Sequence, residues 1–116
     1  MAGQGGRPRV GIVSDVTLQR HRLQSATDKF GLEVCFSGDP ERLLGYPGFP
    51  DANLWLVTLA DETDHPALFD YLLDNTEVSI LFGLDQAPKP GSTEYFRWER
   101  RLLAKLEQQL GSLEEL

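Results

Sequence analysis

Two short apolar stretches, each ending abruptly at a polar residue, decide the fold. Residues 51–58 read DANLWLVT, and residues 9–15 read RVGIVSD. A short apolar run bounded by polar or charged residues is typical of a strand buried inside a sheet. Both stretches therefore predict central strands, and Thr58 and Asp15 stand where these two strands end.

The rest of the chain alternates between strand-like and helix-like segments. We expect strands at about 9–15, 32–36, 54–59 and 78–82, and helices at about 17–30, 39–45, 64–75 and 93–110. Parallel strands need crossover connections, and these are right-handed and usually helical. The alternation therefore predicts an α/β fold, a three-layer flavodoxin-like parallel sheet with strand order 2-1-3-4 and helices on both faces.

Residues suited to capping support several of these boundaries. Asp39 is expected to cap the second helix and Ser92 the last, because their side chains can accept a hydrogen bond from the first helical turn. Gly31 follows the first helix, where the backbone often needs a left-handed conformation. Asp15 or Thr17 is expected to cap that first helix.

The segment after the fourth strand departs from the alternation. Residues 83–91 read GLDQAPKPG, and they carry too few apolar residues for another helix and another strand. We therefore expect a truncated sheet of four strands with a long C-terminal helix, in one domain at 9–111. A flexible tail is expected at 1–8, and a frayed end or the start of a linker at 112–116.

Composition narrows the classes of function. The chain has 116 residues, of which 41% are hydrophobic and 25% charged, as is ordinary for a soluble domain. A net charge of −7 argues against binding to a nucleic-acid backbone, which needs clustered Lys and Arg. The chain has neither the long apolar run of a membrane span nor the hydrophobic start of a signal peptide, so a cytoplasmic location is the default expectation.

Residue types that bind metals or react covalently are few. Cys35 is the single cysteine, which excludes an internal disulfide, and we interpret it as a small buried hydrophobe. His21 and His65 form no metal-ligand spacing and are expected to be solvated. The acidic residues at 61–64 are interpreted as a solvated loop, so no metal site is predicted.

Residues 9–83 resemble the receiver domains of response regulators, which have the CheY-like fold and begin with the same strand–helix units. More narrowly, the chain resembles the N-terminal pseudo-receiver region of CheB-like chemotaxis methylesterases from chemosensory systems that govern pilus motility. The matching stretches are 11–15 (GIVSD), 18–21 (LQRH), 38–40 (GDP), 54–57 (LWLV), 88–95 (PKPGSTEY) and 97–102 (RWERRL).

The resemblance also implies where the chemistry of the family would lie. A receiver uses two acidic residues after the first strand to hold Mg²⁺, an acceptor aspartate after the third strand and a hydroxyl residue after the fourth. The corresponding residues here are Ser14, Asp15, Thr58 and Phe82. A threonine hydroxyl cannot form an acyl phosphate, and a single carboxylate is a poor basis for a Mg²⁺ site.

The resemblance therefore implies a non-catalytic, degenerate receiver that acts as a regulatory or dimerisation module in a chemosensory signalling protein. No catalytic residue and no cofactor are expected, and the methylesterase domain would lie outside this chain. The expected partner is that adjacent domain, another protein or a second copy of the chain. Neither nucleic acid nor a membrane is expected as a partner.

A truncated sheet would also leave the strand at 78–82 at an edge, and unpaired edges invite pairing with another chain. We expect a homodimer, or docking, through this strand and the last helix. Aromatic residues are enriched where partners bind, so Tyr95 and Trp98 are candidate contact residues, together with Leu102 and Leu106 on the same helix. For Trp98 a place in the helix core is the alternative.

Two other functions remain open. An atypical phosphoacceptor would use the carboxylates of Asp15 and Asp61, and Lys89 would then match the lysine of a receiver, although a solvated loop lysine is the simpler interpretation. A small-ligand-binding flavodoxin-like module would need a glycine-rich phosphate loop after the first strand, and residues 14–18 (SDVTL) contain no glycine.

Overall fold

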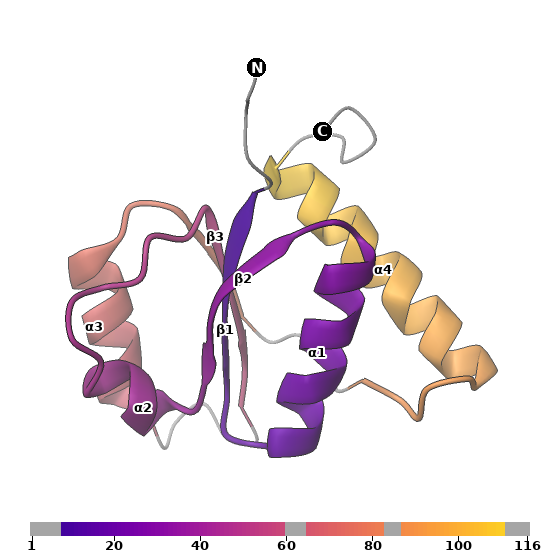
Figure 1. Cartoon of the computed structure of the whole chain (residues 1–116), viewed down its shortest axis with the longest axis horizontal. Coiled ribbons are helices and arrows are strands. Elements are labelled where there is room, and N and C mark those ends of the chain that lie inside the picture. Colours follow the sequence, from indigo (N-terminus) through magenta and orange to yellow (C-terminus); the bar gives the residue numbers. More distant parts are fainter. Residues whose placement is uncertain (1–7, 60–64, 83–86, 111–116) are drawn as a thin grey trace.

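The computed structural model describes residues 8–59, 65–82 and 87–110, which form a parallel sheet with helices on both faces (Figure 1). The strands are β1 (Arg9–Ser14), β2 (Glu33–Gly38), β3 (Leu54–Thr58) and β4 (Ser79–Leu81). The helices are α1 (Thr17–Lys29), α2 (Pro40–Leu44), α3 (Pro66–Asn75) and α4 (Thr93–Leu110). The strand order β2-β1-β3-β4 confirms the predicted topology and is compatible with a flavodoxin-like fold.

The two central strands separate two hydrophobic cores. Successive side chains of a strand point to opposite faces of the sheet. Leu54 and Leu56 accordingly face α1 and α4, whereas Trp55 and Val57 face α2 and α3. The helix pairs lie on opposite sides of the sheet in Figure 1. All five residues of β3 are buried, which explains why its sequence is almost continuously apolar.

Gly11 allows the large Trp55 ring to lie across β1. A Cβ atom at Gly11 would collide with three atoms of that ring, Cζ3, Cε3 and Cη2. Gly11 is paired in register with Trp55, so the tryptophan side chain packs directly over its neighbour's backbone. The glycine in GIVSD is therefore required by packing, because no other residue leaves this space.

Two of the predicted caps are present. The Asp39 carboxylate accepts a hydrogen bond from Arg42 N at 2.8 Å, and the Ser92 hydroxyl accepts one from Tyr95 N at 3.1 Å. Gly31 has the expected positive φ, +85°. The predicted cap of α1 is wrong, because Val16 holds that position without a side-chain hydrogen bond.

Three boundaries differ from the prediction by a few residues. β2 runs on to Gly38, β4 is confined to Ser79–Leu81, and α3 begins at Pro66. Of the predicted tails at 1–8 and 112–116, residues 1–7 and 112–116 lie outside the described residues. Pro8 belongs to the folded part, because its carbonyl accepts a hydrogen bond from Glu33 N at 2.9 Å.

Between β4 and α4 the described residues form neither helix nor strand. Hydrogen bonds from side chains of α1 fix the position of this segment, a role that a neighbouring strand would otherwise have. The Gln19 amide accepts a hydrogen bond from Ala87 N and donates one to Ala87 O at 3.3 Å. Arg22 Nη1 donates a second hydrogen bond to the same carbonyl at 2.8 Å. Both backbone groups of Ala87 are thus paired, as burial requires.

Within the part of the chain that the structure describes, no helix combines the length and the apolar character needed to cross a membrane.

Candidate functional site at the carboxyl edge of the sheet

The carboxyl ends of parallel strands meet at one edge of a sheet, where ligands of open α/β folds usually bind. This edge lies toward the bottom of Figure 1. Ser14 of β1 and Thr58 of β3 are register partners there. Ser14 is fully buried, and Thr58 is only 5% exposed. Two buried hydroxyl residues therefore occupy the centre of the edge.

Ser14 is held by hydrogen bonds within the turn that leads into α1. Its hydroxyl lies 3.2 Å from both the N and the O of Val16. Its carbonyl accepts a hydrogen bond from Arg20 Nη1 at 3.0 Å. The Arg20 guanidinium therefore lies at the end of β1. The sequence pattern did not single out Arg20, although its spacing, one helical turn after Val16, brings it back toward the strand end.

Asp15 is the one carboxylate that the described residues place at the end of β1. One of its oxygens lies 3.4 Å from His65 Nε2, and each of these two side chains is 26% exposed. The contact is an ion pair only when the imidazole is protonated. His65 was expected to be a solvated residue, and the structure instead places it against Asp15. The topology accounts for this position, because the helix after β3 must begin at the same edge where β1 ends.

Phe82 is the residue that the sequence resemblance matched to the hydroxyl residue of receivers. It follows β4 directly, and its ring centroid lies 4.9 Å from that of Phe69 on α3. The ring remains 43% exposed. This position therefore offers an apolar surface and has no group that could donate a hydrogen bond to a phosphoryl oxygen.

Lys89 lies in the loop before α4 and is exposed. Its carbonyl accepts hydrogen bonds from Ser92 N at 3.2 Å and from Ser92 Oγ at 2.7 Å. The loop therefore positions the backbone of Lys89 for the start of α4. Asp61, the other carboxylate of the alternative acceptor site, lies outside the described residues.

Among residues 8–59, 65–82 and 87–110, no group of three or more His, Cys, Asp or Glu side chains could hold a metal ion. Cys35 is partly buried, and this burial raises the pKa of its thiol. A raised pKa lowers the thiolate fraction at neutral pH, so the environment of Cys35 suits a packed side chain better than a nucleophile.

Three of the four predicted contact residues on α4 are part of the hydrophobic core. Trp98 is 4% exposed, and Leu102 and Leu106 are buried with it against α1 and the sheet. They are therefore unavailable as a contact surface, because the i, i+4, i+8 stripe of α4 faces inward. Tyr95 is partly buried, with its ring centroid 5.3 Å from that of Trp98, and Phe96 on the outer side is 55% exposed.

Two grooves in the described part of the chain flank α1. The larger, of about 710 Å³, lies between α1 and β2 and is lined by His21, Gln24, Ser25, Asp28, Leu32, Glu33 and Val34. The smaller, of about 330 Å³, lies between α1 and the start of α4 and is lined by Leu18, His21, Arg22, Ser25, Pro90 and Tyr95. Neither groove is lined by Ser14, Asp15 or Thr58.

No protein-family model, curated protein or solved structure matches this chain.

Proposed function

We propose that this chain is a non-catalytic protein-interaction domain that keeps a receiver-like sheet but does not accept a phosphoryl group. By its resemblance to the pseudo-receiver region of CheB-like methylesterases, it would regulate or position a partner in a chemosensory signalling protein. The observation that carries the proposal is the register pairing of Ser14 with Thr58 at the carboxyl edge. In a receiver this pair of positions would hold a metal-binding carboxylate and the acceptor carboxylate.

The environment of Asp15 also supports the proposal. A carboxylate that helps to hold Mg²⁺ needs other hard oxygen ligands beside it. Here one oxygen of the Asp15 carboxylate lies 3.4 Å from Nε2 of the His65 imidazole, a nitrogen ligand of the protein itself. When this imidazole is protonated, it supplies positive charge to the carboxylate. We therefore assign Asp15 a structural role in joining the end of β1 to the start of α3.

The proposed contact surface is the β4 edge of the sheet together with the apolar side chains beside it. β4 pairs with β3 on one side and is the last strand of the sheet in the described residues. Phe82 directly follows β4 and is exposed. Leu73 is also exposed and lies one helical turn from Phe69, which contacts Phe82. Exposed apolar side chains beside an unpaired edge strand favour docking of another chain.

The loss of phosphoryl binding is tested by titrating ¹⁵N-labelled protein with Mg²⁺ and beryllofluoride, which mimics a bound phosphoryl group. We expect the amide signals of residues 14–16 and 58 to stay in place. An active receiver domain under the same conditions is the positive control. Saturable shifts at these residues that the Asp15→Asn variant loses would instead support the atypical phosphoacceptor.

The contact surface is tested separately by sedimentation velocity at several protein concentrations. Self-association that is weakened by Leu73→Ser and Phe82→Ser, but not by Phe96→Ser, would support a homodimer through the β4 edge. A monomer at all concentrations would leave an adjacent methylesterase domain as the partner of this edge, and the same two variants would then be tested in the full-length protein.

A further inference from the structure

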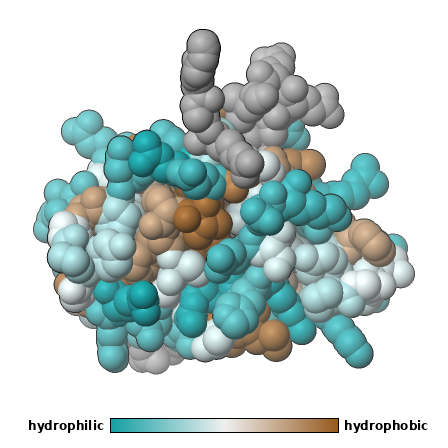
Figure 2. Space-filling model, viewed as in Figure 1, coloured by the Kyte–Doolittle hydropathy of each residue, from teal (hydrophilic) through white to brown (hydrophobic). Residues whose placement is uncertain are grey.

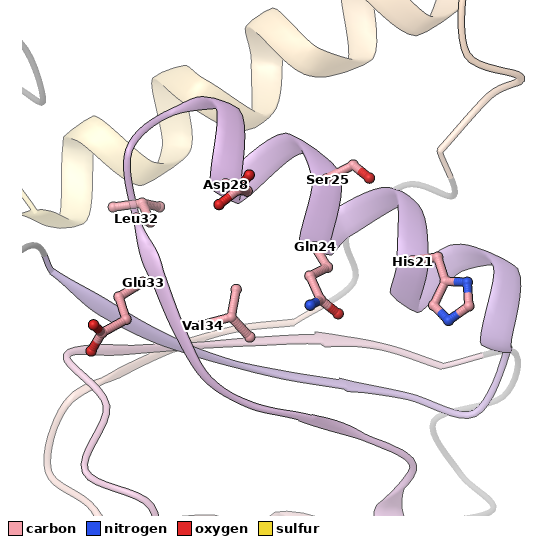
Figure 3. Close-up of a pocket in the computed structure, with 7 residues that line it drawn as sticks. All are labelled: His21, Gln24, Ser25, Asp28, Leu32, Glu33 and Val34. Atoms are coloured by element: carbon pink, nitrogen blue, oxygen red, sulfur yellow. The ribbon is translucent and has the colours of Figure 1, made fainter.

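The groove between α1 and β2 lies at the opposite edge of the sheet from β4 and is built from two short stretches of chain. One wall is the exposed side of α1, which contributes Gln24, Ser25 and Asp28 over little more than one helical turn. The other wall is the connection into β2, which contributes Leu32, Glu33 and Val34. In Figure 3 the Gln24 side chain points toward Val34 across the groove, and Asp28 lies on the side of Leu32.

β2 is an edge strand, so the side of its backbone away from β1 has no neighbouring strand among the described residues. Its pairing with β1 is interrupted after Val34, because Val10 pairs with Val34 and the next residue, Gly11, pairs with Phe36. Such a bulge disturbs the regular ladder and discourages addition of a complete strand. An occupant would therefore lie along the first residues of β2 and against α1.

The surface at this edge combines an apolar area with charge. β2 is the strand nearest the viewer in Figure 1, and Figure 2, in the same view, shows an apolar area bordered by hydrophilic residues. Val34 is partly buried and supplies an apolar floor to the groove. Asp28 and Glu33 are exposed.

The two carboxylates give the groove an acidic character. Within the described residues the Asp28 carboxylate has no ion-pair partner. Glu33 has only a loose one, because its carboxylate lies 3.7 Å from Arg9 Nε and its side chain is 61% exposed. His21, at the other end of the groove, is the remaining titratable lining residue. The groove therefore favours an occupant that carries positive charge.

We propose that this groove binds an extended, basic peptide segment of a partner protein. One apolar side chain of the segment would pack on Val34, and a neighbouring Lys or Arg would face Asp28 and Glu33. Backbone groups of the segment would pair with the side of β2 that faces away from β1. This surface lies at the other edge of the sheet from β4, and the proposal does not depend on whether the chain accepts a phosphoryl group.

A second copy of the chain is a poorer occupant on electrostatic grounds. Two copies that met through this edge by a two-fold axis would bring the same carboxylates, Asp28 and Glu33, close to each other. Each copy also carries a net charge of −7, so long-range repulsion opposes the encounter. A basic segment would instead be attracted both by these carboxylates and by the net negative charge of the chain.

The probes are two fluorescently labelled heptapeptides, one of alternating valine and lysine and one of alternating valine and glutamate. Their binding to the protein is measured by fluorescence anisotropy at low salt. We expect the basic peptide to bind about tenfold more tightly or better, and its affinity to fall as salt is added. The double variant Asp28→Asn, Glu33→Gln should weaken binding roughly three- to tenfold, because it removes two exposed ion pairs. The control Asp70→Asn, Asp74→Asn removes the same charge from exposed positions on α3.

Mapping of the basic peptide on ¹⁵N-labelled protein separates local binding from general attraction by charge. The proposal expects shifts of the amides at 24–28 and 32–34. Equal weakening by both double variants, or shifts centred elsewhere, would overturn it. Self-association that the Asp28→Asn, Glu33→Gln variant strengthens would also overturn it, and would assign the edge to contacts between copies.

Discussion

The carboxyl edge of the sheet and the flank of α1 differ in how much of their surface is already occupied. At the carboxyl edge Ser14 and Thr58 are buried, and Asp15 is engaged by His65. Along α1 two grooves remain open, and one of them is lined by Asp28, a carboxylate without an ion-pair partner in the described residues. Folds of this type normally bind ligands at the carboxyl ends of their strands. In this chain the open, polar grooves instead lie beside α1.

This difference shows that the topology of the sheet and the reactivity of its carboxyl edge depend on different residues. The topology depends on apolar residues in β1 and β3 and on α1 and α4 packing over one face. The reactive edge of a receiver depends on a few side chains at strand ends, which can change without disturbing that packing. The fold therefore indicates only the architecture, and the function must be inferred from the side chains that are present.

The largest expected effect contrasts the inner and outer sides of α4. Leu106→Ala should lower the free energy of unfolding by about 2–5 kcal/mol, because it removes a fully buried leucine and leaves a cavity. Phe96→Ala should change it by only about 0.5 kcal/mol, because that ring is mostly exposed. Urea denaturation measures both. Similar losses for the two variants would contradict the inward orientation of the α4 stripe.

A second prediction concerns the strands that carry the carboxyl edge. Gly11→Ala should destabilise the fold by about 1–3 kcal/mol, because its new methyl group would overpack against the Trp55 ring. Gly45→Ala is the control, because an added Cβ at Gly45 would lie at an ordinary van der Waals distance, 3.5 Å, from the Glu41 carbonyl oxygen. Thermal unfolding followed by Trp fluorescence compares them, and a neutral Gly11→Ala would mean that the ring can move aside.

Part of this fold could be predicted from the sequence alone. The strand order, the caps at Asp39 and Ser92 and the bounds of α4 were predictable, because apolar periodicity and capping chemistry are local signals. The burial of Leu102 and Leu106 was not assigned correctly, because a helical stripe shows that one face is apolar without showing what covers it. Packing against α1 decides that question.

The candidate site was predictable to a similar extent. That the third strand ends at a threonine, Thr58, and not at an aspartate can be predicted from the sequence once the strand is placed. The contact of His65 with Asp15 joins residues 50 positions apart and became visible only when the parallel topology brought two strand ends together. The same is true of Gln19 and Ala87, which are separated by 68 positions.

A third prediction tests whether α1 substitutes for a missing neighbouring strand. Gln19→Ala should cost about 1–2 kcal/mol, because the buried N–H of Ala87 loses its partner. Gln24→Ala, exposed on the same helix, should be nearly neutral. Hydrogen exchange of the Ala87 amide gives a local readout. Unchanged protection of that amide in Gln19→Ala would show that another group holds the segment.

The smallest expected effect concerns pH. Lys29 Nζ lies 2.9 Å from Glu99 Oε1, and this hydrogen bond raises the pKa of Lys29 above its ordinary value of 10.5. A raised pKa of a cationic group adds stability that is complete below pH 10.5 and is lost as the pH rises through the raised value. Burial also raises the pKa of Tyr95, so its effect follows the same direction.

Lys29→Met therefore should flatten, but not abolish, the decline in thermal stability between neutral pH and strongly alkaline pH. Lys105→Met, which alters an exposed lysine on the outer side of α4, is the matched control. A wild-type decline that is identical in Lys29→Met would contradict a role for the pair with Glu99.

The most direct test of the central claim is incubation of the protein with Mg²⁺ and acetyl phosphate, followed at once by intact-mass spectrometry. The account predicts no gain in mass, while an active receiver domain treated alongside gains one phosphoryl group. A single labile phosphoryl adduct would contradict the account. Its loss in Asp15→Asn or in Asp61→Asn would then identify the carboxylate that had replaced the missing acceptor.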